Sequence, residues 1–583
     1  MQSQNEVISL FIKTTKSKNY EYIKLVESYW ENGQSNQRVL YNFGRADLIK
    51  KDESFLRIVK RLCEIAEIPV TGDKPSTESN ILNECSEATL YNYGYLAYRH
   101  LWKELGIEGC LEEAQCGTRI TYPLSETVFL MAIQHLLEPM SKLSAYEHQN
   151  RYFNMNEISL HHMYKSLDRL KEKKEEIETG LFEHNYIREN KKVDVVFYDV
   201  TTFNFESVNA DELRDFGFSK NCRFNEVQVV LGMIIDSDGL PVGYELFKGN
   251  TFDGKTMVKT LENIKKRFGI HRVIIVADRG LNSKDNLKLI KEAGYGYVMA
   301  SKIRGAAAAL QKKVLADEGF TDIYDKKGNL DFRYKILEHE NVFTDENNVL
   351  QKLPENMIVS YSPKRAKKDR TDRERLIEKA NKLLENPEKI KASNKRGGKK
   401  YINQSDPDKE CATFSLDISK IAKDEEFDGY YAIQTSEKTM TAAEVMEAYH
   451  TLWKIEESFR IMKTNLEVRP IYHFKQQRIE GHFVVCFLAF LMERKMELLL
   501  KDAADEECSV SPRRIQEALN TMQLVEVTTT NGTIYIKAKS HPLGQKIFKQ
   551  IKMKMPGNIN TKEDLNACFK LNNDHVSTQL SFL

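Results

Sequence analysis

The chain has 583 residues, of which 41% are hydrophobic and 10% aromatic, so it is long enough for roughly three or four domains with sizeable cores. Its 86 basic and 85 acidic residues leave a net charge of +1, so any surface that binds nucleic acid must be local. The nine cysteines form no Cys-x2-Cys pair, which argues against zinc and against a disulfide framework and fits a reducing cytoplasm.

The first 190 residues divide into a short β segment and a helical region. Residues 20–45 predict two strands around Asn32-Gly33, a pair typical of a hairpin turn. From about residue 51 to 190 the pattern is helical, with apolar periodicity at 125–138 and 160–182. We interpret the adjacent histidines 161 and 162 as surface or core residues rather than metal ligands. No secretory signal is visible at the N-terminus.

From residue 191 the pattern changes to short strands, and two of the apolar runs end in an aspartate. Asp199 follows residues 195–198, and Asp278 follows residues 273–277. Both runs have the length and the β-branched or aromatic content of buried strands. Polar groups just past such strands line the crevice where ligands bind, although either aspartate taken alone is also typical of a turn or helix cap. The predicted order is strand 194–199, strand 226–235, strand 241–248, helix 254–268, strand 272–277, helix 283–293 and strand 295–300.

Residues 279–455 follow Asp278, far more than one crossover needs, so an inserted domain is expected. Alternating apolar runs predict that it is mainly β: 332–339, 356–362, 411–418 and 429–436. Within it, residues 364–400 hold 15 Lys or Arg and 6 Asp or Glu, a local net charge of +9. This basic segment is either a solvated helix and loop or a set of DNA phosphate contacts. The candidate contacts are Lys364, Arg365, Lys367, Lys368 and Arg370.

Residues 443–463 predict a single helical run with a carboxylate, Glu456, at the centre of its apolar face. At about 100° per residue, the side chains within about 60° of Glu456 are those of Val445, Tyr449, Leu452, Trp453, Phe459 and Lys463. Glu456 is therefore expected to face the core, where an unpartnered carboxylate is costly. Together with Asp199 and Asp278 it predicts a divalent-metal site for phosphoryl transfer, because hard cations such as Mg²⁺ take oxygen ligands.

The C-terminal part continues with an apolar helix at 482–500, whose longest apolar stretch, 483–492, is too short to span a bilayer. Ser511-Pro512 predicts a helix start. Residues 537–554 hold six lysines that either contact DNA or face water.

These motifs together resemble the DDE transposases of bacterial insertion sequences, in the group whose last acidic residue lies in a Tyr-x2-Arg-x3-Glu-x6-Lys signature. Tyr449, Glu456 and Lys463 keep that spacing, while Leu452 stands where the family has Arg. The resemblance covers about residues 20–500. Further matches are YDVTTF around Asp199, ADRG around Asp278, the stretch from Gly217 to Thr256, and RPIYH from Arg469 to His473.

The resemblance implies an α/β fold: a ribonuclease H-like core, with its first and fourth strands side by side, interrupted by the mainly β insertion and preceded by a helical DNA-binding region. The expected regions are a β-hairpin module (1–50), the helical region (51–190), the first part of the core (191–302), the insertion with its basic segment (303–436), the second part of the core (437–505) and a C-terminal region (506–583).

The implied activity is cut-and-paste transposition, with cleavage at the ends of the element and strand transfer into target DNA. Asp199, Asp278 and Glu456 would hold two Mg²⁺ or Mn²⁺ ions. Lys463 would meet a DNA phosphate, and Tyr449 either does the same or packs in the core. The implied partners are double-stranded DNA and a second copy of the chain in the DNA complex. The expected location is the bacterial cytoplasm, on the nucleoid when DNA is bound, with no membrane contact.

Two alternatives stay open from the sequence. One is a ribonuclease H-like nuclease or resolvase that cuts without joining. The other is an inactive transposase-derived DNA-binding protein, against which the retention of all three acidic residues speaks. No Gly-rich phosphate-binding loop is present, so an ATP-driven mechanism is not supported.

Overall fold

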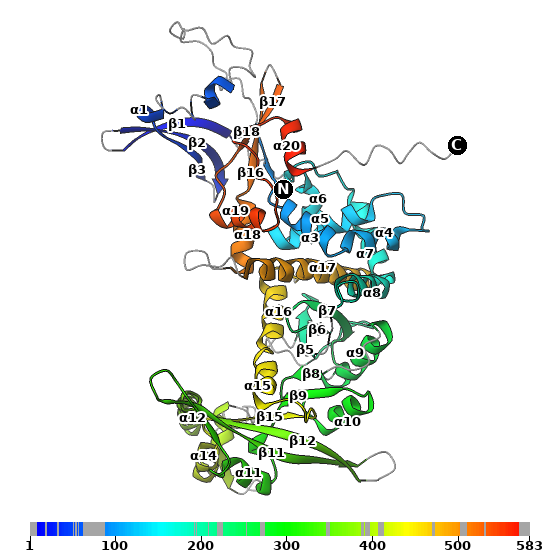
Figure 1. Ribbon diagram of the computed structural model, residues 1–583, viewed down its shortest axis with the longest axis vertical. Coiled ribbons are helices and arrows are strands. Elements are labelled where there is room, and N and C mark those ends of the chain that lie inside the picture. Colours follow the sequence, from blue (N-terminus) through cyan, green and yellow to red (C-terminus); the bar gives the residue numbers. More distant parts are fainter. Residues whose placement is uncertain are drawn as a thin grey trace. The chain divides into compact units, whose positions relative to one another are not determined.

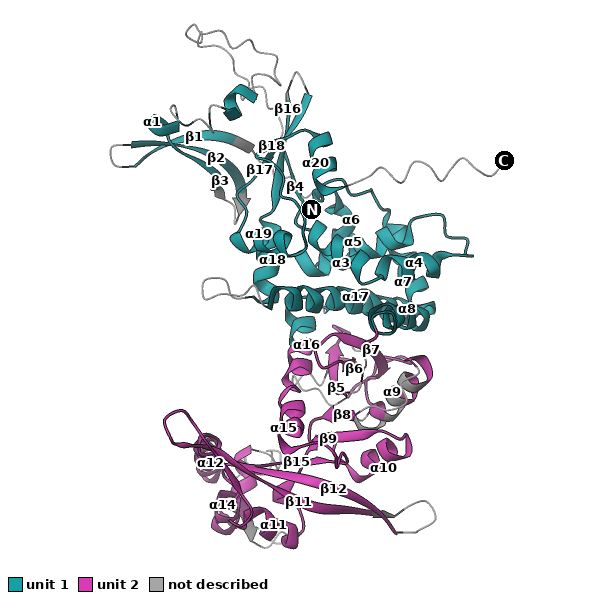
Figure 2. Ribbon diagram, viewed as in Figure 1, with its two compact units in different colours: residues 1–189, 460–583 teal, residues 190–459 magenta. Residues whose placement is uncertain are grey.

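The computed structural model divides the chain into two compact units, which we describe separately (Figure 2): unit 1 comprises residues 1–189 and 460–583, and unit 2 comprises residues 190–459. The described residues are 9–17, 20–31, 34–49, 52, 55, 57–61, 88–191, 193, 195–207, 209–217, 225–251, 253–268, 274–344, 350–385, 390, 397–405, 413–468, 471, 473–501, 510–529 and 532–570.

Unit 2 is built on one large mixed sheet (Figure 1). Its first part consists of β5 (Val195–Asn204), β6 (Gln228–Ile235), β7 (Pro241–Lys248), α9 (Asp253–Phe268), β8 (Ile274–Ala277), α10 (Lys284–Glu292) and β9 (Gly296–Ala300). This confirms the strand and helix order predicted from the apolar runs. Every residue of β6 is buried, as expected for a strand covered on both faces. β8 lies parallel between β5 and β9, so the first and fourth strands are neighbours as predicted.

The second part of unit 2 extends the same sheet. It contains α11 (Ala308–Leu315), β10 (Thr321–Tyr324), β11 (Leu330–Thr344), β12 (Leu350–Tyr361), α12 (Pro363–Leu384), β13 (Ile402–Ser405), β14 (Thr413–Leu416), α14 (Ile418–Glu425) and β15 (Tyr430–Thr435). β15 pairs antiparallel with β9, and the described strands of the sheet follow the order β10-β11-β12-β15-β9-β8-β5-β6-β7. The four alternating apolar runs coincide with β11, β12, β14 and β15, although residues 411 and 412 lie outside the described part.

Two helices close unit 2 and carry the candidate signature residues: α15 (Ala442–His450) and α16 (Trp453–Thr464), the second of which continues into unit 1. Thr441 begins α15 with a capping box, because its hydroxyl accepts from the Glu444 amide while the Glu444 carboxylate accepts from the Thr441 amide. The prediction of one helix over 443–463 is therefore wrong. The chain turns at Thr451 and Leu452, where the Leu452 amide donates to the carbonyl of Tyr449, three residues earlier.

Unit 1 is mainly helical, with two small sheets. The helices are α1 (Ala46–Ile49), α3 (Leu96–Glu104), α4 (Ile107–Gln115), α5 (Leu124–Leu137), α6 (Lys142–Glu147), α7 (Leu160–Glu172), α8 (Lys174–Phe182), α17 (Gln476–Leu500), α18 (Pro512–Asn520), α19 (Pro542–Gln550) and α20 (Lys562–Phe569). The strands are β1 (Ser9–Ser17), β2 (Tyr20–Glu31), β3 (Gln34–Arg45), β4 (Ala88–Asn92), β16 (Gln523–Thr529), β17 (Gly532–Lys537) and β18 (Ile559–Asn560).

The predictions for unit 1 are confirmed for the main elements. β2 and β3 form the antiparallel pair expected over 20–45, with β1 added on the other side of β2; the Asn32-Gly33 turn lies outside the described residues. Ser511 caps α18 as predicted. The run 160–182 forms two helices. In the region expected to be helical, residues 88–92 form the strand β4 instead, because they pair with β16 from the distant C-terminal part. No described helix is long and apolar enough to cross a membrane.

Candidate active site

Asp199 lies within β5, flanked by buried residues on either side along the strand. Its own side chain is half-buried, and its Oδ1 accepts a hydrogen bond of 2.8 Å from the Val200 amide. The apolar residues Val196, Phe197 and Tyr198 place the strand in the core, so the aspartate is held by a rigid sheet rather than by a loop.

Asp278 directly follows β8, and its carboxylate closes a tight turn. Oδ1 accepts from the Gly280 amide at 2.7 Å and from the Leu281 amide at 3.3 Å. A Cβ atom at position 280 would lie 2.9 Å from this oxygen, so any larger residue there would push the Asp278 carboxylate aside. The glycine of the ADRG motif thus leaves the carboxylate free to take this position against the backbone amides.

The register of the sheet brings the two aspartates together. β5 and β8 are parallel and pair Val195 with Ile274 and Phe197 with Val276. Asp199 and Asp278 each lie two residues beyond the last of these pairs. The parallel register therefore places the two aspartates at the same end of two neighbouring strands.

Glu456 stands in the first turn of α16, and it is exposed, whereas Leu452 and Phe459 are buried. The prediction that Glu456 faces the core is wrong. The turn at Thr451 and Leu452 separates α15 from α16, so one helical wheel cannot describe both, and the expected cost of burying this carboxylate does not arise. Glu456 instead lines a cleft of about 450 Å³. The other lining residues are Arg365, Tyr431, Ile433, Met446, Tyr449, His450, Leu452 and Trp453.

Tyr449 connects this cleft to the aspartates. Burial, a hydrogen bond with Tyr431, and the negative charges of Asp278 and Glu456 all raise the pKa of the Tyr449 phenol. Both carboxylates therefore lie within electrostatic reach of one phenol, whose ring centroid is 5.7 Å from that of Tyr431. A tyrosine phenol is protonated at neutral pH even without this shift, so Tyr449 is a hydrogen-bond donor there.

Arg365 is the member of the basic segment that lines the cleft with Glu456. Its guanidinium lies 4.4 Å from the centroid of the Tyr431 ring. Lys364 is exposed and donates to Asp331 at 2.8 Å, which raises the Lys364 pKa. The remaining three candidates, Lys367, Lys368 and Arg370, are exposed on α12.

Arg365 and Tyr431 also line a second cleft, of about 510 Å³, with further cations. These are Arg279, Lys302 and Arg304. Neither Lys302 nor Arg304 was singled out from the sequence, because they stand outside any charge run and only the fold gathers them. Lys463 lies half-buried in the last turn of α16, seven positions after Glu456, and Leu452 fills the position of the signature arginine with a buried apolar side chain.

The acidic residues offer the oxygen ligands that hard divalent cations prefer. The ligand oxygens of Asp199, Asp278 and Glu456, all three among the described residues, do not all lie within 4.8 Å of one another.

Comparison with known families gives two matches. A family model described as the transposase DDE domain matches residues 191–492, more than half of the chain, so the protein belongs to the DDE transposases. Residues 11–70 match the N-terminal domain of IS1634 family transposases, which makes it a transposase of a bacterial insertion sequence. No curated protein matches the chain. The protein is thus a DNA transposase, an enzyme whose family binds transposon ends and generally cleaves and transfers DNA strands with divalent metal ions.

Proposed function

We propose that Asp199, Asp278 and Glu456 are the catalytic acids of this transposase and that they act in cut-and-paste transposition. The observation that carries the assignment is the shared register of the two aspartates on β5 and β8. Glu456 is the third acid because its charge and that of Asp278 both act on Tyr449. Glu457, the next residue on the helix and the other glutamate that could fill this role, does not line the cleft.

We assign two Mg²⁺ or Mn²⁺ ions to these carboxylates, since all three donors are hard oxygens on separate elements. When bound, such ions lower the pKa of a coordinated water and stabilise a leaving 3′-oxygen. The chain's own part is orientation: the backbone amides of Gly280 and Leu281 hold Asp278, and the Val200 amide holds Asp199. Tyr449, protonated at neutral pH, donates a hydrogen bond to a phosphate oxygen or to Glu456.

The order β7-β6-β5-β8-β9, in which β6 alone runs opposite to the other four strands, supports a ribonuclease H-like core. On this assignment, residues 191–302 and 437–505 form the core and 303–436 the insertion. The remaining regions keep their expected bounds, with a hairpin module at 1–50, a helical DNA-binding region at 51–190 and a C-terminal region at 506–583.

The two clefts that share Arg365 and Tyr431 form the DNA path in this proposal. Arg279, Lys302, Arg304 and Arg365 supply a row of cations for phosphates, which bind DNA without reading its sequence. Arg365 also brings a guanidinium next to Tyr431, which contacts Tyr449. In this proposal it supplies the positive charge beside Tyr449 that the signature arginine, replaced here by Leu452, would otherwise supply. Lys463 on α16 adds a point charge for a further phosphate.

Lys364, Lys367, Lys368 and Arg370 extend the DNA path along α12. Because the two ends of an element must be cut and joined together, we expect a homodimer on double-stranded DNA. The substrate also places the protein in the bacterial cytoplasm, on the nucleoid when DNA is bound.

The test is a cleavage and joining assay with the purified chain, Mg²⁺, and DNA taken from both flanks of its own gene. Cleavage at the ends followed by joining to a plasmid is the expected result. Cleavage of the ends without any joining to the plasmid would instead identify the protein as a nuclease. If variants with Asp199 or Asp278 replaced still cleaved and joined DNA, the catalytic assignment would be refuted.

A further inference from the structure

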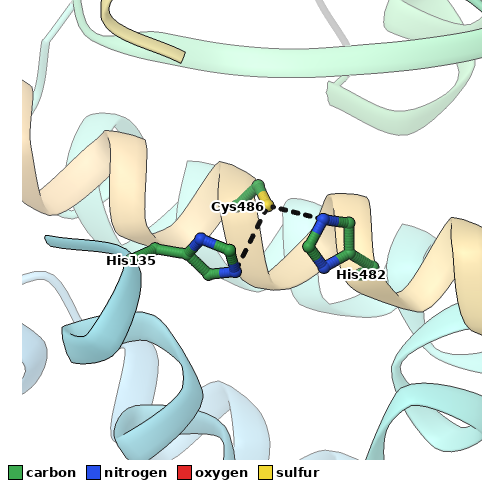
Figure 3. A group of neighbouring side chains, drawn as sticks. All are labelled: His135, His482 and Cys486. Carbon is green, nitrogen blue, oxygen red and sulfur yellow. Dashed lines mark hydrogen bonds between the residues drawn. The ribbon is translucent and has the colours of Figure 1, made fainter. Parts of the chain in front are cut away.

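A cluster of two histidines and one cysteine lies buried in unit 1 (Figure 3). His135 comes from α5, while His482 and Cys486 lie one helical turn apart on α17. The three residues are 3%, 5% and 0% exposed, respectively. The Cys486 sulfur is 3.5 Å from Nε2 of His482 and 4.0 Å from Nε2 of His135. The three potential ligand atoms all lie within 4.8 Å of one another.

These separations suit a single tetrahedral ion. With a Zn–S distance of about 2.3 Å and a Zn–N distance of about 2.0–2.1 Å, tetrahedral angles put ligand atoms roughly 3.3–3.6 Å apart. The sulfur and His482 already have this spacing, and the sulfur and His135 need to approach by only about half an ångström.

Backbone carbonyls orient both imidazoles. Nδ1 of His135 lies 2.9 Å from the Leu466 carbonyl, so this nitrogen carries the proton and donates, and the lone pair of Nε2 faces the cluster. A histidine that binds a metal almost always donates its other N–H in this way. His482 faces the Cys486 sulfur and the Val468 carbonyl, 3.1 Å away, through the same nitrogen, Nε2, and its buried Nδ1 has no hydrogen-bond partner in the described part of the chain. The described fold therefore leaves one ring nitrogen of His482 without a hydrogen bond. Binding of an ion by Nε2 requires the ring proton to move to Nδ1 and the contact with the Val468 carbonyl to open.

A cation already stands at this point. The ammonium of Lys142, a residue only 6% exposed, lies 3.0 Å from Nε2 of His135. The cluster thus surrounds one positive charge with nitrogen and sulfur atoms and no carboxylate.

We propose that His135, His482 and Cys486 bind a zinc ion, with His473 as a candidate fourth ligand, and that Lys142 holds the same position when the ion is absent. The ring of His473 lies 5.4 Å from that of His482, centroid to centroid. On binding, the Cys486 thiol would give up its proton to solvent, the ring proton of His482 would move from Nε2 to Nδ1, and the Lys142 ammonium would move away. Imidazole and thiolate ligands favour Zn²⁺ over Mg²⁺, so this site is distinct from the carboxylate site.

The missing Cys-x2-Cys pair excludes only zinc sites built from neighbouring cysteines. Here His482 and Cys486 share a helix face, and His135 is 351 residues before Cys486. The site would fix the segment directly after α16, whose Leu466 carbonyl accepts a hydrogen bond from His135, against α5 and α17. Zinc would therefore stabilise the segment through which the chain leaves the helix that carries Glu456.

The test uses the full-length chain, stripped of metal and titrated with Co²⁺, which reports thiolate ligation by a sulfur-to-cobalt absorption band. We expect one equivalent to produce the band, Zn²⁺ to abolish it and excess Mg²⁺ to leave it unchanged. Cys486→Ser should lose the band, and His135→Ala should weaken Co²⁺ binding by about tenfold or more. Cys116→Ser, at an exposed free cysteine, is the matched control and should keep the band.

Two further variants make the result decisive. Lys142→Met removes the competing cation and should tighten Co²⁺ binding, even if Cys486→Ser folds poorly. The double variant Asp199→Asn/Asp278→Asn should keep the band, which separates this site from the catalytic one. A wild-type chain without the band, a band that persists in Cys486→Ser, or weaker binding by Lys142→Met would each overturn the proposal.

Discussion

Asp199 lies on β5 and Asp278 directly follows its parallel neighbour β8, each two residues beyond the pair formed by Phe197 and Val276. The Asp199 carboxylate is held by the strand, and the Asp278 carboxylate is held by the turn after β8, through the backbone amides of Gly280 and Leu281. Both acids are thus oriented by backbone groups before any DNA or metal arrives, and this preorganisation is what a catalytic pair needs.

Replacing either aspartate by asparagine should abolish strand cleavage while leaving DNA binding nearly intact, because the change removes charge at constant shape. Cleavage of end DNA and its retention in a gel-shift assay measure the two effects separately. Asp238→Asn is the control, since this exposed residue belongs to the turn between β6 and β7, as predicted from its SDG sequence. A parallel loss of binding and cleavage would indicate a structural role.

Gly280→Ala should impair cleavage with little effect on folding. The added Cβ would lie 2.9 Å from Oδ1 and 3.4 Å from Oδ2 of Asp278, so the carboxylate must move and lose its amide hydrogen bonds. Gly109→Ala is the matched control, because a Cβ there meets nothing within 4 Å and the residue lies in neither cleft. Thermal unfolding and cleavage are measured on both variants. Full activity in Gly280→Ala would mean that the orientation of Asp278 is unimportant.

The basic segment should contribute salt-dependent DNA binding through its exposed side chains. Replacing Lys367, Lys368 and Arg370 by Ala should weaken binding and reduce the slope of log K against log salt by about 0.9 for each DNA phosphate that the variant no longer neutralises. Arg373 must be left intact, because it is buried and paired with Asp428 and Glu425. An unchanged slope in the triple variant would support the interpretation of this segment as a solvated helix.

Glu493 should make the stability of the protein pH-dependent. Burial raises its pKa to about 8 from an ordinary value of 4.5, while the Tyr98 hydroxyl donates to its Oε2 at 2.6 Å. The folded state thus binds the proton more tightly than the unfolded state. Its contribution is fully present below pH 4.5 and is lost as pH rises toward 8, at up to about 1.4 kcal/mol per pH unit.

Glu493→Gln should flatten this decline, because a neutral amide keeps the shape without a titrating proton. Denaturant unfolding at several pH values between 4.5 and about 8 measures it. The exposed Glu157→Gln serves as control and should leave the wild-type pH dependence unchanged. Wild-type stability that is flat across this window would contradict the assignment.

Local pattern was enough to predict the elements that carry the aspartates. Each of the strands β5 to β9 is a short apolar run bounded by turns, whereas the pairing of β5 with β8, which brings Asp199 and Asp278 to neighbouring strands, was implied by the family resemblance. The environment of Glu456 did not follow. A helical wheel assumes a continuous helix, and the turn at Thr451 and Leu452 breaks it without any proline or glycine to mark the place.

Groups assembled from distant positions were also beyond the sequence. Lys302 and Arg304 reach the cleft of Arg365 only because β15 pairs with β9. His135 and Cys486 meet because α5 packs against α17, and the His-x3-Cys spacing on α17 was the one local indication of that cluster. Tertiary packing, not local preference, creates such sites.

The last prediction concerns which of two adjacent glutamates is catalytic. A shift of one residue moves a side chain about 100° around a helix, so Glu456 and Glu457 cannot serve the same site. Glu456 lines the cleft with Tyr449 and acts electrostatically on that phenol, together with Asp278. Glu457 is half-buried and lies outside that lining. The structure therefore favours Glu456 for a different reason than the sequence did, through the cleft wall rather than through an apolar stripe.

Glu456→Gln should remove both cleavage and metal-dependent joining, because it deletes one oxygen charge of the three-carboxylate site without changing the side chain's size. Glu457→Gln should retain most of both activities and serves as the matched control on the same helix turn. End cleavage and plasmid joining are measured for each variant, with circular dichroism to verify folding. An inactive Glu457→Gln beside an active Glu456→Gln would show that the third acid is Glu457 and that α16 presents its other flank to the DNA.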